Sequence, residues 1–167
     1  MSPFTLRRTA ARIVLLDARG HVLLLEASDP ADPSKGRWWE IPGGGIDHNE
    51  SSAEAARREL YEETGIADVE IGPCVWVQHA RFRFGGFEFD QFEHVHVAWT
   101  RSAHEVRPAG LELLEAAAFK GHHWWGLDEL LSSEVKVLPH RLREFLPDLV
   151  AGSLPPEPID ITHTGGW

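Results

Sequence analysis

The sequence predicts an α/β fold of the α+β type, built on a β-sheet with a few helices. Runs rich in β-branched or aromatic residues recur along most of the chain, as is typical of strands. One segment, residues 52–64, carries helix-capping residues at both ends. The chain has 167 residues, enough to bury about 70% of its unfolded-state surface in one core. We therefore expect one domain that needs no disulfide for stability.

The N-terminal part predicts a hairpin, a loop and a short strand, after a short basic arm. Residues 11–16 and 21–26 are rich in aliphatic side chains, and the sequence DARG between them favours a turn. A loop rich in Asp, Pro and Ser spans residues 28–36. A short extended segment, residues 37–41, follows and is ended by Pro42 and the glycines after it.

A helix is predicted over residues 52–64. Ser51 is a suitable N-cap, and Glu54 three residues later completes a capping box. Gly65 stands where a left-handed C-terminal cap requires a glycine. Local sequence therefore defines both ends of this helix.

Strands are predicted after the helix. They correspond to residues 69–80 and to the alternating stretch RFRFGGFEFDQFEHVHVAW, residues 81–99. Within that stretch, Gly85 and Gly86 supply the positive φ angles of a two-residue hairpin turn. The segment therefore predicts a long antiparallel hairpin.

The C-terminal part is less regular. Residues 102–121 form a long connection, part-helical at most, that the sequence does not assign. We expect a short helix after the segment HHWWGLDELL, and a second helix in residues 138–150, which carry apolar side chains at helical spacing. The tail, residues 151–167, is proline-rich, has little to fold with, and is expected to be extended or disordered. The single domain is therefore placed at residues 1–150.

Composition limits the classes of partner and location. Sixteen basic and twenty-six acidic residues give a formal charge of −10, so steering toward nucleic acid is disfavoured. A small anion could still bind through a divalent cation that reverses the local field. The single cysteine, Cys74, suits a reducing cytoplasm. Apolar runs are too short for a signal-peptide core or a membrane span, so no membrane contact is expected.

Three glutamates of the predicted helix, Glu59, Glu62 and Glu63, are related by i, i+3 and i+4 and lie on one face. An adjoining apolar stripe would hold this helix against a sheet and partly desolvate the carboxylates. Unpaired carboxylates there would take up protons or destabilise the fold. A bound Mg²⁺ or Mn²⁺ would resolve this conflict. The alternative interpretation is a solvated helix face.

The segment before the helix has features that complement such a site. Gly43, Gly44 and Gly45 let the backbone approach a ligand closely, and a backbone carbonyl is a further ligand for a hard cation. A plain loop is the alternative. Arg58 could pair with Glu50 and so tie the loop to the helix.

These residues resemble the Nudix box, G-x5-E-x7-R-E-U-x-E-E-x-G-U, in which U is aliphatic. Every fixed position is matched over 23 residues, by Gly44, Glu50, Arg58, Glu59, Leu60, Glu62, Glu63, Gly65 and Ile66. Asp47 and Asn49 stand where glutamate and glycine are frequent in the family, which affects the loop and spares the ligands. More loosely, the order of elements from about Ala10 to Leu131 resembles the Nudix αβα sandwich with a mixed central sheet.

The resemblance implies a hydrolase acting on phosphoric anhydride bonds. The expected reaction is Mg²⁺-dependent cleavage of a nucleoside diphosphate linked to a group X, by water attack at phosphorus. It implies that Glu59, Glu62, Glu63 and the carbonyl of Gly43 hold Mg²⁺ or Mn²⁺. Glu62 or Glu63 would orient or deprotonate the water, with Arg58 in support. The substrate would be a small-molecule nucleoside diphosphate derivative. The identity of X, the nucleobase and the oligomeric state, a homodimer included, stay open.

The general base is also open, because related enzymes carry it either on the box helix or on a later loop. Glu93, on a predicted strand, and Glu112 and Glu115, in the long connection, are the other candidates.

Three side chains are candidates for substrate binding. Arg81 and Arg83, on one face of their strand, could clamp a terminal phosphate, and Trp39 could stack on a base. An exposed strand face and core packing are the respective alternatives.

Two other classes of protein compete with this interpretation. His94 and His96 alternate on one strand and, with Glu93, could hold zinc or non-haem iron. No further ligand stands at a recognisable spacing, so ordinary buried or surface histidines are the default. The second alternative is a non-catalytic nucleotide-sensing or regulatory module on the same fold, against which the intact box argues.

Overall fold

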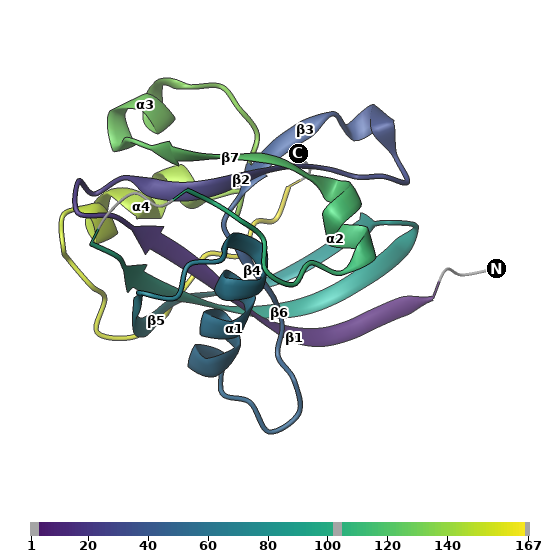
Figure 1. The fold of residues 1–167 in the computed structure, drawn as a ribbon, viewed down its shortest axis with the longest axis horizontal. Helices are drawn as coiled ribbons and strands as arrows, with labels where there is room; N and C mark the ends of the chain where they lie inside the picture. Colours follow the sequence, from purple (N-terminus) through teal and green to yellow (C-terminus); the bar gives the residue numbers. More distant parts are fainter. Residues whose placement is uncertain (1–3, 102–104, 166–167) are drawn as a thin grey trace.

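The computed structural model describes residues 4–101 and 105–165, and shows a curved mixed sheet with helices on both faces (Figure 1). Within these residues the strands run in the order β8-β3-β2-β1-β6-β5-β9, with β4 beside β1 and β7 beside β2. The strands are Thr5–Leu16 (β1), Val22–Ser28 (β2), Arg37–Glu40 (β3), Gly43–Gly45 (β4), Glu70–Phe84 (β5), Phe87–Trp99 (β6), Phe119–Trp125 (β7), Val137–Leu138 (β8) and Ile159–Asp160 (β9). The pairs β1–β6, β3–β8 and β5–β9 are parallel and the others antiparallel, which confirms the predicted mixed sheet.

The first strand is longer than its aliphatic residues predict. The basic arm continues β1, because β1 pairs in parallel with β6 from Thr5, opposite Glu88, to Leu16, opposite Trp99. This pairing spans more than eighty residues of sequence, so the local pattern at the N-terminus did not reveal it. The predicted hairpin of β1 and β2 is confirmed, with Leu16 opposite Val22.

The box helix, α1, spans Ser52–Thr64, as predicted. The Oγ of Ser51 accepts a hydrogen bond from the backbone N–H of Glu54 at 3.1 Å, and the Glu54 carboxylate accepts one from the N–H of Ser51 at 3.2 Å. Gly65 ends the helix in the left-handed conformation, at φ 75°. The capping box and the glycine cap are therefore both confirmed.

The long hairpin of β5 and β6 is also confirmed. Gly85 and Gly86 have φ angles of 60° and 85° and connect Phe84 to Phe87, which face each other across the turn. Positive φ at two adjacent turn residues matches the twist of the flanking strands, and glycine adopts it without steric cost.

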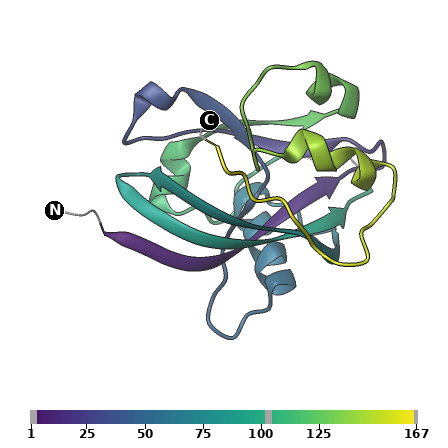
Figure 2. The ribbon, with the colours of Figure 1, turned by 180° about the vertical axis from the view of Figure 1, so that it is seen from behind.

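Helices cover the two faces of the sheet, as the αβα prediction requires. On one face α1 packs through Ala55, Ala56 and Leu60. On the other lie α3 (Leu127–Ser132) and α4 (Leu142–Val150), which Figure 2 shows from behind. The residues that α3 and α4 bury against the sheet are Leu130, Leu142, Leu146 and Leu149.

The long connection, which the sequence left unassigned, is partly helical. It contains α2, Leu113–Ala118, while residues 102–104 lie outside the described part of the chain. Helix α3 begins inside the segment HHWWGLDELL rather than after it, because Gly126 provides the extended residue before its first turn. No helix in the described ranges is long and apolar enough to cross a membrane. The cytoplasmic location stays a prediction.

The expectation that the tail has little to fold with is wrong. The chain after residue 152 crosses the face that α4 also covers (Figure 2), and Ile159 pairs with Trp76 of β5. Ile161 is fully buried in the core beneath α4. The tail is extended, but two isoleucines find apolar partners that only the folded domain brings together. The domain boundary at residue 150 stays a prediction.

Candidate functional site

The three glycines before α1 form a strand rather than a plain loop. β4 pairs antiparallel with β1, with Gly43 opposite Arg12 and Gly45 opposite Ala10. A Cβ on Gly44 would lie 2.6 Å from carboxyl atoms of Glu59. A Cβ here would force the Glu59 carboxylate to move, so the glycine lets this carboxylate lie against β4.

Three carboxylates converge beside this strand. Glu59 and Glu63 come from α1, Glu115 comes from α2, and one ligand oxygen of each lies within 4.8 Å of the others. In the described residues no other three or more His, Cys, Asp or Glu side chains form such a group. We call Glu59, Glu63 and Glu115 the acidic cluster.

Glu63 is the most buried member of the acidic cluster, with 2% of its surface exposed. Its Oε2 accepts a hydrogen bond from the N–H of Gly43 at 3.3 Å. Its Oε1 is buried and has no hydrogen-bond partner among the described residues. Burial raises the pKa of Glu63 well above its usual range, and the neighbouring carboxylates of Glu115 and Glu59 raise it further. A cation would satisfy this oxygen and favour the ionised form.

Glu59 is held differently from Glu63. It is 7% exposed, and its Oε1 accepts a hydrogen bond from Arg58 at 2.9 Å. Burial raises its pKa above the usual value, although the Arg58 guanidinium opposes this shift. Glu62, predicted to share the site, does not join the acidic cluster. Its side chain is 33% exposed and lies 3.3 Å from the same guanidinium.

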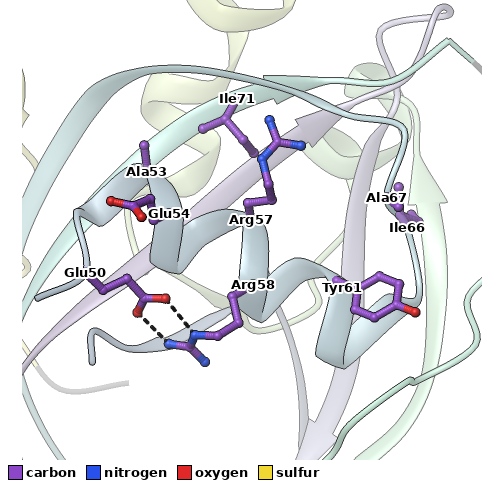
Figure 3. A pocket seen from close by; sticks show the side chains of 9 residues that line it. All are labelled: Glu50, Ala53, Glu54, Arg57, Arg58, Tyr61, Ile66, Ala67 and Ile71. Carbon is purple, nitrogen blue, oxygen red and sulfur yellow. Dashed lines mark hydrogen bonds and ion pairs between the residues drawn. The ribbon is translucent and has the colours of Figure 1, made fainter. Parts of the chain in front are cut away.

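Arg58 and Glu50 form the predicted link between loop and helix. The Nε and Nη2 of Arg58 donate to the two carboxylate oxygens of Glu50 at 2.8 and 2.9 Å (Figure 3). Nη2 also donates to the carbonyl of Gly45 at 2.9 Å. The hydrogen bonds from Arg58 lower the pKa of Glu50. This bidentate pair keeps the loop, β4 and α1 in one arrangement.

The donor set of the acidic cluster fits a hard divalent cation. Carboxylate oxygens on a partly buried surface are the ligands that Mg²⁺ and Mn²⁺ prefer, and the unpartnered Oε1 of Glu63 is one such donor. Glu59 and Glu63 were expected as ligands, whereas Glu115 was expected only as a candidate base. The roles of Glu62 and of the Gly43 carbonyl stay predictions.

The other two base candidates lie elsewhere. Glu93 is 2% exposed, and its oxygens accept hydrogen bonds from Gln78 at 2.6 Å and from Arg12 at 3.2 Å. Glu112 is exposed and precedes the first turn of α2. Of the three candidates, the structure brings only Glu115 into the acidic cluster.

The predicted substrate-binding side chains have other partners. The Arg81 side chain is 74% exposed and lies 3.8 Å from Asp90. Arg83 is 70% exposed and pairs with Glu88 at 2.9 Å. Trp39 is half-buried, and its ring packs edge-on against Trp125 at a centroid distance of 5.3 Å. Their role in substrate binding stays a prediction.

The histidine alternative finds little support in the geometry. His96 is buried, and its two ring nitrogens lie 2.8 Å from the Ser52 hydroxyl and 2.9 Å from the Gly72 carbonyl, so it links β6 to the start of α1. His94 is half-buried, and burial lowers its pKa. Neither belongs to a group of three possible ligands in the described part of the chain.

Two arginines of β1 were not singled out from the sequence. Arg12 reaches Glu93 and Glu40, at 3.2 and 3.4 Å. Arg8 lies over the Phe89 ring at 5.1 Å, and its Nη1 would be 3.2 Å from a Cβ on Gly45. Alternation along β1 could have identified them, because both share the face of the buried Val14.

Comparison with known proteins gives one family. The family model described as the NUDIX domain matches residues 6–149. Among curated proteins, the RNA pyrophosphohydrolase of Bartonella henselae is 47% identical over 53 residues, which are 32% of this chain and 27% of that protein. The chain spans only 24% to 39% of the length of such curated relatives.

Solved structures show the same fold. The dihydroneopterin triphosphate pyrophosphohydrolase of E. coli aligns with a TM-score of 0.62 at 14% identity, over 86% of this chain and 95% of that one. The Ap4A hydrolase of C. elegans aligns with a TM-score of 0.58 at 20% identity, over 86% and 96%. At these identities the likeness concerns the fold alone.

Proposed function

Because this chain belongs to the NUDIX family, we propose that it hydrolyses a phosphoric anhydride bond of a nucleoside diphosphate derivative, with Mg²⁺ or Mn²⁺ at the acidic cluster. The observation that carries this proposal is the environment of the Glu63 carboxylate. Its carboxylate is 2% exposed, has one oxygen with no hydrogen-bond partner in the described part of the chain, and has an oxygen within 4.8 Å of those of Glu59 and Glu115. Such a group stabilises the fold poorly by itself and binds a divalent cation well.

A divalent ion held there would activate water and neutralise charge on the diphosphate. The residues of the chain prepare the site for it. The Gly43 N–H holds one oxygen of Glu63, so the other oxygen is left for a ligand. Arg58 fixes Glu59 and the loop together. Both carboxylates are thus oriented before a substrate binds, which reduces the reorganisation needed in the transition state.

We assign Glu115 as the group that accepts the proton of the attacking water. It is the half-buried member of the acidic cluster and lies on a separate helix from the two proposed ligands. Glu62 is the competing candidate, since it lies at the exposed rim beside Arg58. Glu115→Gln and Glu62→Gln distinguish them: the variant that lacks the base loses the fall of kcat toward acidic pH, and the other variant keeps it.

The substrate class is the second part of the proposal. A small nucleoside diphosphate derivative fits the acidic charge of −10, which disfavours long-range attraction of nucleic acid. A triphosphorylated RNA 5′ end is the alternative, because the matched curated relatives are RNA pyrophosphohydrolases. Both substrates contain the same anhydride chemistry, so only their contacts outside the acidic cluster would differ.

The test is a product-release screen with and without Mg²⁺. It compares dinucleoside polyphosphates, nucleotide sugars, ADP-ribose, oxidised nucleoside triphosphates and 5′-triphosphorylated RNA. Glu63→Gln should remove turnover of any active substrate, while Glu134→Gln, at an exposed position, should not. If a nucleotide binds without turnover in the wild type, the chain is a non-catalytic nucleotide-sensing module instead.

A further inference from the structure

Arg12 forms a buried ion-pair network behind the acidic cluster. Its side chain is 16% exposed, and its Nε and Nη1 lie 3.2 Å from Glu93 and 3.4 Å from Glu40. Burial alone would lower the pKa of Arg12, but the carboxylates of Glu93 and Glu40 outweigh burial and raise it. The side chain therefore stays cationic and joins three strands, β1, β6 and β3.

Glu93, the partner of Arg12 on β6, is itself held by further hydrogen bonds. The Oε1 of Glu93 accepts a hydrogen bond from Gln78 at 2.6 Å. The Oε2 of Glu93, which Arg12 contacts, also accepts one from Gln91. Gln91 is fully buried and in turn accepts a hydrogen bond from Arg8 at 2.6 Å. Glu93 is thus held from β1, β5 and β6 at once, and it gives Arg12 a rigid partner.

The near side of Arg12 touches the strand of glycines. Gly43 is the register partner of Arg12, and a Cβ on Gly43 would lie 2.7 Å from the Cα and 2.9 Å from the Cδ of Arg12. The N–H of Gly43 donates to Glu63 at 3.3 Å. A continuous path therefore runs from Glu93 through the Arg12 stem and Gly43 to Glu63.

We propose that Arg12 is a positioning residue for the acidic cluster. By bridging Glu93 and Glu40 it fixes its own methylene stem, the stem seats Gly43, and Gly43 holds Glu63 in the orientation that binds the cation. This inference rests on the proposed function only in that the acidic cluster binds a divalent ion. Arg12, on β1 and outside the box, would then control the orientation of Glu63 inside the box.

The test measures Mn²⁺ binding to the metal-free full chain, without substrate, by electron paramagnetic resonance. Arg12→Lys keeps the charge but loses the fork that reaches two carboxylates at once. We expect Mn²⁺ to bind about 10-fold more weakly to it, the effect typical of removing an outer support of a metal ligand. The bound Mn²⁺ spectrum should also broaden, because Glu63 is less well ordered.

The matched control is Arg143→Lys. Arg143, on α4, is also partly buried and donates to the backbone carbonyls of Leu130, Ser133 and Val135, at the end of α3 and just after it. Its replacement should lower the thermal unfolding temperature without changing Mn²⁺ affinity. Equal weakening in both variants would mean a general loss of stability and would overturn the proposal.

A second variant covers the case in which Arg12→Lys does not fold. Glu93→Gln keeps the shape of the partner and removes only its charge, and it should weaken Mn²⁺ binding by about 10-fold. Affinity within experimental error of the wild type, in whichever of the two variants folds, overturns the positioning role. Failure of the wild type itself to bind Mn²⁺ would instead reject the proposed metal site, and with it the premise of this inference.

Discussion

Two arginines support the acidic cluster, and they do so in different ways. Arg58 is 28% exposed and bonds to Glu50, Glu59 and Glu62, all within eight residues along the chain. Arg12 is 16% exposed and bonds to Glu40 and Glu93, which are 28 and 81 residues away. The first network depends on a loop and a helix that adjoin in sequence. The second exists only after three strands have come together.

This difference has energetic consequences. Breaking a partly exposed ion pair costs little, about 1 kcal/mol or less, because water solvates the remaining partner. Removing one partner of a buried pair leaves an uncompensated charge and costs about 3–5 kcal/mol. Arg58 is therefore expected to matter mainly for the chemistry of the acidic cluster, and Arg12 for both its geometry and the stability of the domain.

The largest expected effect is at Glu63, the most buried member of the acidic cluster. Glu63→Gln should reduce kcat on the order of 10³-fold, the size seen when one preorganised electrostatic group is removed. Discontinuous or coupled phosphate-release assays, on the substrate identified in the screen, measure this change in kcat. Activity within 10-fold of the wild type would show that neither arginine network serves catalysis through Glu63.

The next effect separates the arginines directly. Arg12→Met should lower the free energy of unfolding by about 3–5 kcal/mol, whereas Arg58→Met should lower it by about 1 kcal/mol. Chemical denaturation of both variants, with the same replacement in each, makes the comparison. Equal losses would contradict the distinction between a buried and a partly exposed network.

A smaller effect is expected at Gly44, on the side of the acidic cluster that Arg58 supports. In Gly44→Ala the new Cβ would come 2.6 Å from carboxyl atoms of Glu59, so that side chain must move, and Mn²⁺ affinity should fall about 10-fold. Gly121→Ala is the control, since the nearest atom to its Cβ is 4.0 Å away. A wild-type affinity in Gly44→Ala would show that Glu59 is not held in place by close packing.

The smallest effect concerns pH. The folded-state pKa of Glu63 is raised well above its usual range by burial, so its contribution to stability is complete below the unfolded pKa of about 4.3 and is lost as pH rises through the folded value. Without metal, Glu63→Gln should match the wild type at low pH and become more stable than it, by about 1 kcal/mol or more, as pH rises.

Urea denaturation at several pH values, with and without Mn²⁺, measures this difference. Mn²⁺ should restore the wild type and not the variant, since the ion favours the ionised carboxylate. A stability difference that does not change with pH would show that Glu63 titrates normally in the folded chain.

Much of the fold could be predicted from local patterns. The caps at Ser51 and Gly65 defined α1, and the glycine pair at residues 85 and 86 defined the longest hairpin. These signals are reliable because each concerns backbone groups within a few residues of the capping or turning side chain. The tail was misjudged for the opposite reason: nothing near Ile161 in sequence indicates the core that buries it.

The same division holds within the site. The spacing of Glu59 and Glu63 placed them on one helix face, and the pairing of Arg58 with Glu50 followed from the same motif. Glu115 was only one of several candidates, because its distance from α1 depends on how the long connection folds. Glu62, equally prominent in the motif, turned out to bind Arg58 instead of joining the acidic cluster.

The sequence by itself determined the acidic helix, its caps and the glycines that let it pack closely, because periodicity and backbone chemistry act over a few residues. Only the tertiary structure decided which carboxylates converge and which arginine stands behind them. Convergence depends on the parallel pairing of β1 with β6 and on the path of α2. Those contacts join distant segments, and their free energy comes mainly from burying apolar surface of several strands at once, which no short stretch of sequence encodes.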